Sequence, residues 1–332
     1  MPMNTSCIIR GMGHCVPDSV LTNADFERMV ETNDEWIVSR TGIRERHVAL
    51  NGETCVDLCH GASVAALEKA GMTAEELTHV IVATFSPDAV IPSAACMLSH
   101  RLGISGRMSM DVSAACSGFL YALETARALI ALHPQARVLV AACDIVSSRV
   151  DYTDRGTCIL FGDGAGAVVL TADAPGLSGG RVLDVLVASD GAVGDLLTVK
   201  GGGSGTPYKL GDTIRRDFFV EMNGREVYKH AVRAMSSVCE ELLTRHGLTK
   251  DDVDVLIPHQ ANLRIVEAVG KRLDIPESKV FTNLQKYGNT SAASVPLALS
   301  EAVAEGFVKP GHLVLLGTFG GGFTWGSALV KF

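Results

Sequence analysis

The chain has 332 residues, of which 47% are hydrophobic and 20% are charged, and its formal net charge is −8. At roughly 150 residues per domain, this length predicts two units or one large α/β unit, and the apolar content excludes intrinsic disorder. The net negative charge argues against a nucleic-acid-binding protein, because such proteins need a basic surface.

Membrane and secretion signals are not expected either. No apolar run reaches the length of about 18 residues that a membrane-spanning helix needs, and Met1–Pro17 lacks the continuous apolar core of a signal peptide. The nine cysteines are an odd number spread along the chain, which favours reduced thiols and a cytoplasmic location. Cys55, Cys59 and His60 fall on one predicted helix, and we interpret them as structural.

The first part of the chain alternates between helical and extended patterns. Strands that alternate with helices predict βαβ units and mostly parallel sheets. Residues 172–222 are rich in glycine, and we expect hairpins and loops there. In chain order the sequence predicts a helix over 54–70, a strand ending at Ala83, a helix near 93–102, a strand near 107–112, a helix over about 116–132, a strand over 137–143 and a strand near 158–170.

The second part repeats the first. Gly71-Met72-Thr73 is followed by an acidic pair and an apolar strand. A similar segment, Gly247-Leu248-Thr249, begins 176 residues later (71 to 247) and is also followed by an acidic pair and an apolar strand. Two such copies predict two halves, 1–172 and 173–332, related by a pseudo-twofold axis. In the second half we expect a helix over about 224–246, a strand over 253–257, a helix over 261–273, a strand over 279–283, a helix over about 290–305 and strands over 312–318 and 324–331.

Four polar turns follow predicted strands, which is where open α/β sheets bind their ligands. They carry Cys116, His259, Asn289 and the run Gly320–Gly322. Cys116 begins a long apolar helix, and the partial positive charge of a helix N-terminus should lower the pKa of its thiol and make it a nucleophile. His259 is a candidate general base or donor, and no second His or Cys stands near it at metal-ligand spacing. Asn289 does not titrate near neutral pH, so its use is to donate hydrogen bonds, for example to a developing oxyanion.

Two other interpretations of these motifs are weaker. The order Cys, His, Asn also fits a papain-like cysteine hydrolase, but the local signature around the cysteine is missing and the duplicated α/β pattern does not suit that fold. Gly162-x-Gly164-x-Gly166 suggests a dinucleotide-binding loop, but the spacing differs and a strand follows it. We therefore interpret these glycines as sites of close backbone packing.

The motifs together resemble the β-ketoacyl-[acyl-carrier-protein] synthase III family of the thiolase-like superfamily, from about Ile8 to Phe332. That resemblance implies a five-layered αβαβα fold and a ping-pong decarboxylative Claisen condensation of an acyl-CoA with malonyl-acyl-carrier-protein. It implies Cys116 as the acylated residue, Cys116 and Gly321 as the oxyanion hole, and His259 and Asn289 as donors to the malonyl thioester. The motifs are Asp34–Ile43, Ser113-Ala114-Ala115-Cys116-Ser117-Gly118, Thr153–Thr157, His259-Gln260-Ala261-Asn262, Gly288–Ala292 and Gly320–Gly326.

The resemblance also assigns the surrounding residues. It places CoA on Trp36, Arg40, Arg155 and Asn262, since an indole can stack on adenine and arginine suits phosphate. It places the acyl pocket at Met222, Gly224, Tyr228 and Phe319, with Ile91 reaching the partner's pocket in a homodimer. It places the acidic acyl-carrier protein on Lys229, Arg264, Lys271 and Arg272, and it implies neither a metal nor a cofactor.

One departure from the family pattern concerns primer choice. The family often has an aromatic residue where this chain has Ile91, so a preference for acetyl-CoA is open. A housekeeping initiator of fatty-acid synthesis is the leading interpretation. A paralogue that condenses or transfers acyl groups in a specialised metabolite pathway is the second, and a catalytically silent, carrier-binding subunit is a third that the complete Cys-His-Asn set argues against.

Overall fold

The computed structural model describes residues 7–332. The first six residues of the Met1–Pro17 segment, over which no signal peptide was expected, lie outside the described residues.

The second half of the main sheet repeats the strand order of the first, except for one edge strand. From the edge inward, the first half runs β5-β4-β6-β7-β1 and the second half runs β11-β12-β13-β8, where a single bridge from Val280 to Leu256 stands in place of a strand equivalent to β5. The halves join where β1 pairs with β8 over three residues, Cys7 to Ile9 against Val182 to Gly180. The strands are β1 (Cys7–Cys15), β4 (His79–Ala83), β5 (Met108–Val112), β6 (Arg137–Asp144), β7 (Gly164–Ala172), β8 (Gly180–Ser189), β11 (Val255–Pro258), β12 (Leu313–Gly320) and β13 (Thr324–Lys331).

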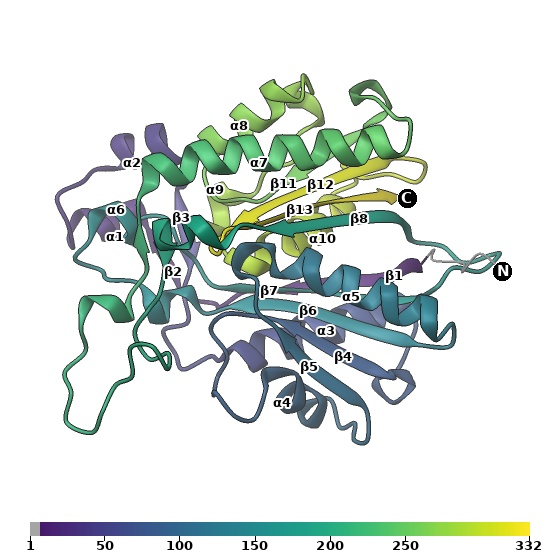
Figure 1. Ribbon diagram of the computed structural model, residues 1–332, viewed down its shortest axis with the longest axis horizontal. Coiled ribbons are helices and arrows are strands. Elements are labelled where there is room, and N and C mark those ends of the chain that lie inside the picture. Colours follow the sequence, from purple (N-terminus) through teal and green to yellow (C-terminus); the bar gives the residue numbers. More distant parts are fainter. Residues whose placement is uncertain (1–6) are drawn as a thin grey trace.

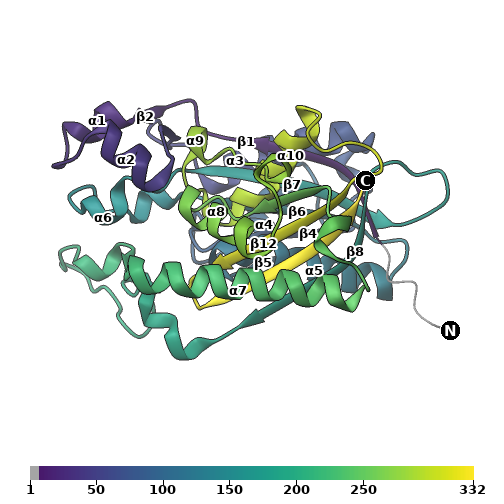
Figure 2. The same ribbon diagram turned by 90° about the horizontal axis from the view of Figure 1, so that it is seen from above.

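Helices cover both halves of the sheet and fill the space between them, which gives the expected five layers (Figures 1 and 2). The central pair, α5 (Gly118–Leu132) and α10 (Ser294–Ala304), is buried between the two halves in one apolar cluster. The outer helices are α3 (Cys55–Ala70) and α4 (Ala94–Arg101) on the first half, and α7 (Gly224–Arg245) and α8 (Leu263–Arg272) on the second.

Local sequence signals explain where these helices begin and end. Thr54 and Asp57 form a reciprocal capping box at the start of α3, and Gly71, with φ of 62°, ends this helix.

The remaining elements are short: β2 (Val20–Thr22), β3 (Glu45–His47), β9 (Leu197–Thr198), β10 (Glu221–Met222), α1 (Asn23–Glu27), α2 (Asp34–Thr41), α6 (Arg155–Cys158) and α9 (Leu284–Tyr287).

Four sequence-based expectations about the elements were wrong. The sheet was expected to be mostly parallel, but it is mixed: only β4–β5, β4–β6 and β11–β12 are parallel pairs. The reason is that each half adds antiparallel strands after its βαβ units. The strand expected near 158–170 begins at Gly164, after α6 and a turn. The strand expected over 279–283 is one bridge from Val280 to Leu256, because a 3₁₀ turn and α9 enclose it. The Gly-rich segment contains β8, a full strand of the main sheet.

The close-packing interpretation of the glycine run is confirmed. A Cβ at Gly162 would lie 2.2 Å from the Tyr287 carbonyl oxygen, and one at Gly166 would lie 2.7 Å from the Leu297 nitrogen. Ala115–Leu132 is the one stretch among the described residues whose helical length and mean hydropathy would suit a membrane span, although Glu124 and Arg127 interrupt its apolar run. Half of that stretch is buried, as in a core helix.

Candidate active site

A cavity of about 760 Å³ opens beyond the carboxyl ends of β4, β5, β6, β11 and β12. It brings together most of the residues singled out from the sequence, although they come from both halves of the chain. Ile91, Lys271 and Arg272 do not line it. The predicted site residues that do are Trp36, Arg40, Cys116, Arg155, Met222, Gly224, Tyr228, Lys229, His259, Asn262, Arg264, Asn289, Phe319 and Gly321.

Cys116 lies in a 3₁₀ turn, Ala115–Ser117, that leads directly into α5. Ala115 adopts a left-handed backbone with φ of 45°, which turns the chain sharply before the helix. The cysteine is only 8% exposed, and burial raises the pKa of its thiol to about 12. The expected lowering of this pKa is therefore wrong in direction, because the sequence places the thiol at a helix start but does not show how completely it is enclosed.

The C-terminal glycine turn packs directly against this cysteine. A Cβ at Gly320 would lie 2.6 Å from the Cys116 nitrogen and 3.0 Å from its Cβ, so only glycine fits. Gly321, the next residue, lines the cavity. The two backbone segments expected to supply an oxyanion hole therefore lie in contact.

His259 is buried beside the same cavity at the end of β11. Its Nδ1 lies 2.5 Å from Ser294 Oγ, and burial lowers the pKa of the ring to about 4, so it is neutral at neutral pH. Ser294 Oγ also accepts a hydrogen bond from the Gln260 backbone N–H, which leaves the hydroxyl hydrogen free for Nδ1. A neutral ring that accepts at Nδ1 carries its proton on Nε2 and can donate it.

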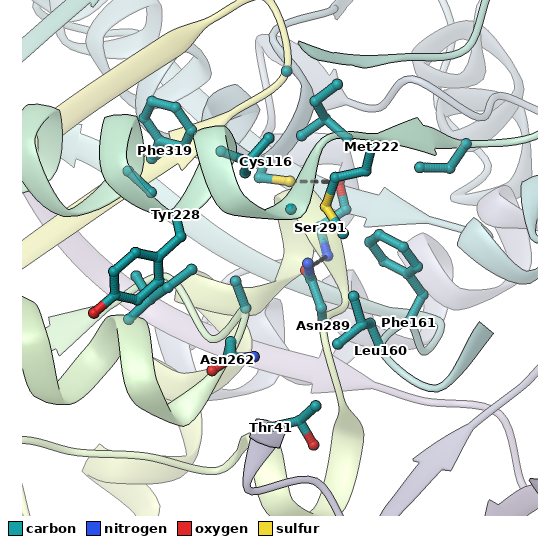
Figure 3. Close-up of a pocket in the computed structure, with 18 of the residues that line it drawn as sticks. Thr41, Cys116, Leu160, Phe161, Met222, Tyr228, Asn262, Asn289, Ser291 and Phe319 are labelled. Atoms are coloured by element: carbon teal, nitrogen blue, oxygen red, sulfur yellow. Dashed lines mark hydrogen bonds between the residues drawn. The ribbon is translucent and has the colours of Figure 1, made fainter. Parts of the chain in front are cut away.

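Hydrogen bonds to both halves of the chain hold Asn289 in place. Its backbone N–H donates to Leu160, and its carbonyl accepts from Gly162. Its side-chain oxygen accepts a hydrogen bond of 2.9 Å from the Ser291 N–H (Figure 3). With the oxygen occupied in this way, the amide group offers its N–H donors to the cavity.

Aromatic and basic residues from three helices form the mouth of the cavity. The Arg155 guanidinium lies over the Trp36 ring, 4.9 Å from its centroid, and that of Arg40 lies 6.0 Å away. Asn262 caps α8 by accepting from the Arg264 N–H and donates to the Arg40 carbonyl. The indole and the cations thus lie together at the mouth of the cavity.

The inner wall of the cavity is apolar and includes residues that sequence analysis missed. Met222, Tyr228 and Phe319 line it as expected (Figure 3). Ile91 is 87% exposed and lies outside this chain's own cavity. The additional wall residues come from the Gly-rich segment and from the first half: Leu197, Thr198, Val199, Val220 and Phe161. Composition identified that segment only as a loop region, so nothing in it marked a cavity wall.

Two serines in contact with the predicted catalytic groups were also missed. Ser291 Oγ donates to Cys116 Sγ over 3.5 Å, and Ser294 contacts His259. Ser291 lies in the Gly288–Ala292 motif and Ser294 follows that motif. Serine before a helix is common as a turn or cap residue, so nothing in the sequence indicated these contacts.

The expected docking residues are basic and accessible. Arg264 lies at the mouth, while Lys271 and Arg272 are exposed further along α8. Lys229 on α7 is paired with Glu226 at 2.7 Å, which reduces its free charge.

Away from the cavity, the thiols of Cys55, Cys59 and Cys143 gather within 4.8 Å of one another. They form the one cluster with metal-ligand spacing among residues 7–332. Cys55 Sγ also contacts the Thr84 hydroxyl and the Cys143 carbonyl, as ordinary packed thiols do.

Comparison with known proteins agrees with this geometry. Residues 110–191 match the family model of 3-oxoacyl-[acyl-carrier-protein] synthase III, and residues 243–332 match the model of its C-terminal part. The β-ketoacyl-[acyl-carrier-protein] synthase III of Oleidesulfovibrio alaskensis is 56% identical over 99% of this chain and 100% of its own. That of Xanthomonas euvesicatoria is 48% identical over 98% of each chain.

Solved structures give the same result. The 3-oxoacyl-[acyl-carrier-protein] synthase III of Aquifex aeolicus has a TM-score of 0.89 and 43% identity, covering 98% of this chain and 100% of its own. The priming β-ketosynthase of the R1128 polyketide pathway has a TM-score of 0.90 and 33% identity, covering 100% of this chain and 98% of its own. These likenesses contradict the papain-like alternative. The chain belongs to the β-ketoacyl-[acyl-carrier-protein] synthase III family, the thiolase-like acyltransferases that carry out the initiating condensation of fatty-acid synthesis.

Proposed function

We propose that this protein condenses a short acyl-CoA, with acetyl-CoA as the expected primer, with malonyl-acyl-carrier-protein. The products are 3-oxoacyl-acyl-carrier-protein, CoA and CO₂. The observation that carries the proposal is the meeting of Cys116, His259 and Asn289 in one cavity whose mouth bears Trp36 and arginines. We expect no metal or cofactor to take part.

In the first half-reaction, the Cys116 sulfur attacks the thioester carbonyl of acyl-CoA. The carbonyl oxygen becomes an oxyanion that the backbone N–H groups of Cys116 and Gly321 receive. The carbon–sulfur bond to CoA then breaks, and CoA leaves as a thiol with the proton that Cys116 gave up. An acyl-Cys116 thioester remains, and the Trp36 indole and the arginines hold the departing nucleotide.

In the second half-reaction, the malonyl thioester of the carrier protein occupies the same cavity. The bond to its carboxylate breaks, CO₂ leaves, and the electron pair becomes an enolate. His259 Nε2 and the Asn289 amide donate to the enolate oxygen, for which two neutral, fixed donors in a dry site are well suited. The enolate carbon attacks the acyl-Cys116 carbonyl, and collapse of that adduct expels the Cys116 thiolate.

The carrier protein would approach the face formed by Arg264, Lys271, Arg272 and Lys229. We propose a homodimer in which Ile91 of each subunit completes the acyl pocket of the other, since this apolar side chain is 87% exposed in the single chain. We also propose that the chain is divided into two halves, 1–172 and 173–332, and that the protein is cytoplasmic.

A second candidate function is priming of a specialised metabolite pathway. The likeness to the R1128 priming β-ketosynthase favours it, as does the replacement of an aromatic residue by Ile91. A panel of acyl-CoA primers tested with malonyl-carrier protein separates the two: acetyl-CoA should be used well by a fatty-acid initiator and poorly by a specialised enzyme.

Radiolabelled acyl-CoA tests the acyl-enzyme step. We expect label on the peptide that contains Cys116, and none in Cys116→Ser, which should also lose condensation. Label on another of the nine cysteines would refute the assignment.

A further inference from the structure

The hydroxyl of Ser291 touches the sulfur on which the proposed reaction depends. Ser291 Oγ donates to Cys116 Sγ over 3.5 Å, and Ser291 is 2% exposed (Figure 3). This is the one side-chain hydrogen bond to that sulfur among residues 7–332. Neither His259 nor Asn289 makes it.

The fold holds Ser291 in a specific and unfavourable backbone conformation. Its φ is +51°, in the left-handed region where a residue with a side chain is uncommon. The backbone on either side is tied down: the Ser291 N–H donates to Asn289, and the Ala292 N–H donates to the Asp144 carboxylate over 3.2 Å. The turn is therefore fixed from both halves of the chain, and its strain places the hydroxyl against the sulfur.

Asp144 is itself firmly anchored. Its other carboxylate oxygen accepts hydrogen bonds from the Thr84 and Ser86 hydroxyls and from the Phe85 N–H, at 2.9 to 3.0 Å. Since Asp144 lies at the end of β6 and these partners follow β4, the Ser291 turn is fixed to the main sheet of the first half.

The electrostatics around Cys116 make this hydroxyl important. Burial is the largest cause of the raised pKa of Cys116; the Ser291 hydrogen bond lowers that pKa, and the charge of Asp144 raises it. The same hydroxyl also lowers the pKa of Asp144, so the carboxylate competes for its one hydrogen, but the contact with hydrogen-bond geometry is the one to the Cys116 sulfur. His259 supplies no positive charge, because burial lowers its pKa to about 4. The charge that develops on the sulfur therefore has a neutral hydroxyl donor and the start of α5 to stabilise it.

We propose that Ser291 is a fourth catalytic residue, whose hydroxyl stabilises the Cys116 thiolate when it attacks acyl-CoA and when condensation expels it. The proposal rests on the proposed role of Cys116 as the nucleophile. It is separate from the decarboxylation step, since the contact from Ser291 to Asn289 is made by the backbone.

Alkylation of Cys116 by iodoacetamide, followed by mass spectrometry of its peptide, tests this without any substrate. Loss of a hydrogen bond to the charged form should raise the thiol pKa by about one unit, so Ser291→Ala should hold about tenfold less thiolate at pH 8. A more basic sulfur is also a better nucleophile, with a Brønsted slope of about 0.4–0.5, so alkylation should slow about three- to fourfold.

Two further variants keep the test decisive. Ser291→Gly also lacks the hydroxyl, but glycine accepts positive φ without strain, so this variant should fold at least as well and show the same slowing. Ser236→Ala removes a buried serine hydroxyl on α7 that has no hydrogen-bond partner within the described residues, and its alkylation rate should match the wild type.

The half-reactions give a second readout. Both Ser291 variants should lose more rate in acylation by acyl-CoA than in decarboxylation of malonyl-carrier protein, because the backbone contact to Asn289 remains. Wild-type alkylation rates in both Ser291 variants would overturn the inference. The exposed Cys96 should be alkylated at a similar rate in every variant, so its peptide is an internal control. A wild-type Cys116 peptide that is not alkylated while that of Cys96 is would instead overturn the proposed nucleophile.

Discussion

The Ser291 backbone N–H and the Asn289 side-chain oxygen lie 2.9 Å apart, and this hydrogen bond decides which end of the amide faces the cavity. Because a backbone N–H can only donate, the Asn289 oxygen must point toward it and the amide nitrogen must point elsewhere. The sequence identified Asn289 as a donor from its chemistry, and this contact supplies the orientation which that role requires.

Asn289→Ala and Asn289→Asp should therefore separate the two half-reactions. Both variants should still be acylated by acyl-CoA, but malonyl-carrier protein decarboxylation should fall by about 100- to 1,000-fold, the usual cost of one lost donor. The carboxylate of the Asp variant can still accept from Ser291, yet it has no hydrogen to donate. Single-turnover assays of each half-reaction would measure this, and equal losses in both would mean that Asn289 is structural.

The buried, neutral His259 should make the protein less stable in acid. Its pKa falls from 6.5 to about 4 on folding, so between these values the unfolded chain binds a proton that the folded chain does not. The free energy of unfolding should therefore fall as the pH falls, by about 2 kcal/mol from pH 7 to pH 5.

Denaturant titrations of the wild type and His259→Gln at both pH values isolate this contribution. The wild type should lose about 2 kcal/mol more than the variant. The raised pKa of buried Asp144, about 6, acts in the opposite direction, but it is present in both proteins and cancels. An equal pH dependence in both would show that His259 is not a buried neutral group.

Charge reversal on α8 should affect only the carrier-dependent step. Lys271→Glu and Arg272→Glu, at exposed residues that do not line the cavity, should raise the apparent KM for malonyl-carrier protein and hardly change acylation by acyl-CoA. Added salt should weaken the carrier step more, since exposed charges are screened beyond about 8–10 Å near physiological ionic strength. Lys309→Glu, on an exposed lysine that does not line the cavity, is the control. A similar fall in acylation would point to a defect in folding rather than in docking.

Ile91 should set the length of primer that the enzyme accepts. A branched side chain is smaller than an aromatic ring and holds a fixed shape, so it should leave room for primers longer than acetyl. Each buried methylene contributes about 0.8 kcal/mol, so a few matched carbons can change the preference tenfold or more. Ile91→Phe should narrow the range toward acetyl-CoA in a primer panel. If the wild type used only acetyl-CoA and Ile91→Phe used the same primers, another part of the cavity wall, such as Met222 or Tyr228, would set the primer length.

Gly320→Ala should damage the site while leaving the rest of the fold in place. The added Cβ would lie 2.6 Å from the Cys116 nitrogen, so either the glycine turn or the cysteine turn must move. We expect at least tenfold slower acylation, since small displacements of reacting groups are costly. Gly205→Ala, at a glycine with open space around it and no positive φ, is the control for substitution alone. Wild-type acylation kinetics in Gly320→Ala would show that the turn adapts.

The sequence by itself determined the duplicated architecture, most helices and the three chemical groups of the site. The acidic pair after Gly71 and its repeat after Gly247 marked equivalent points, and apolar periodicity marked α3, α5 and α7 to within a few residues. It also predicted that Cys116, His259 and Asn289 would meet, because strand ends at one edge of a sheet gather in space. These features depend on local patterns and on general rules of sheet topology.

The tertiary structure alone decided how each group behaves. It placed the Ser291 hydroxyl against Cys116 and Ser294 against His259, reduced the expected strand at 279–283 to one bridge, and made β8 part of the main sheet. It also reversed the expected shift of the Cys116 pKa. A helix N-terminus is a local feature that a sequence can reveal, whereas desolvation depends on every segment that closes around the thiol, and those segments come from both halves of the chain.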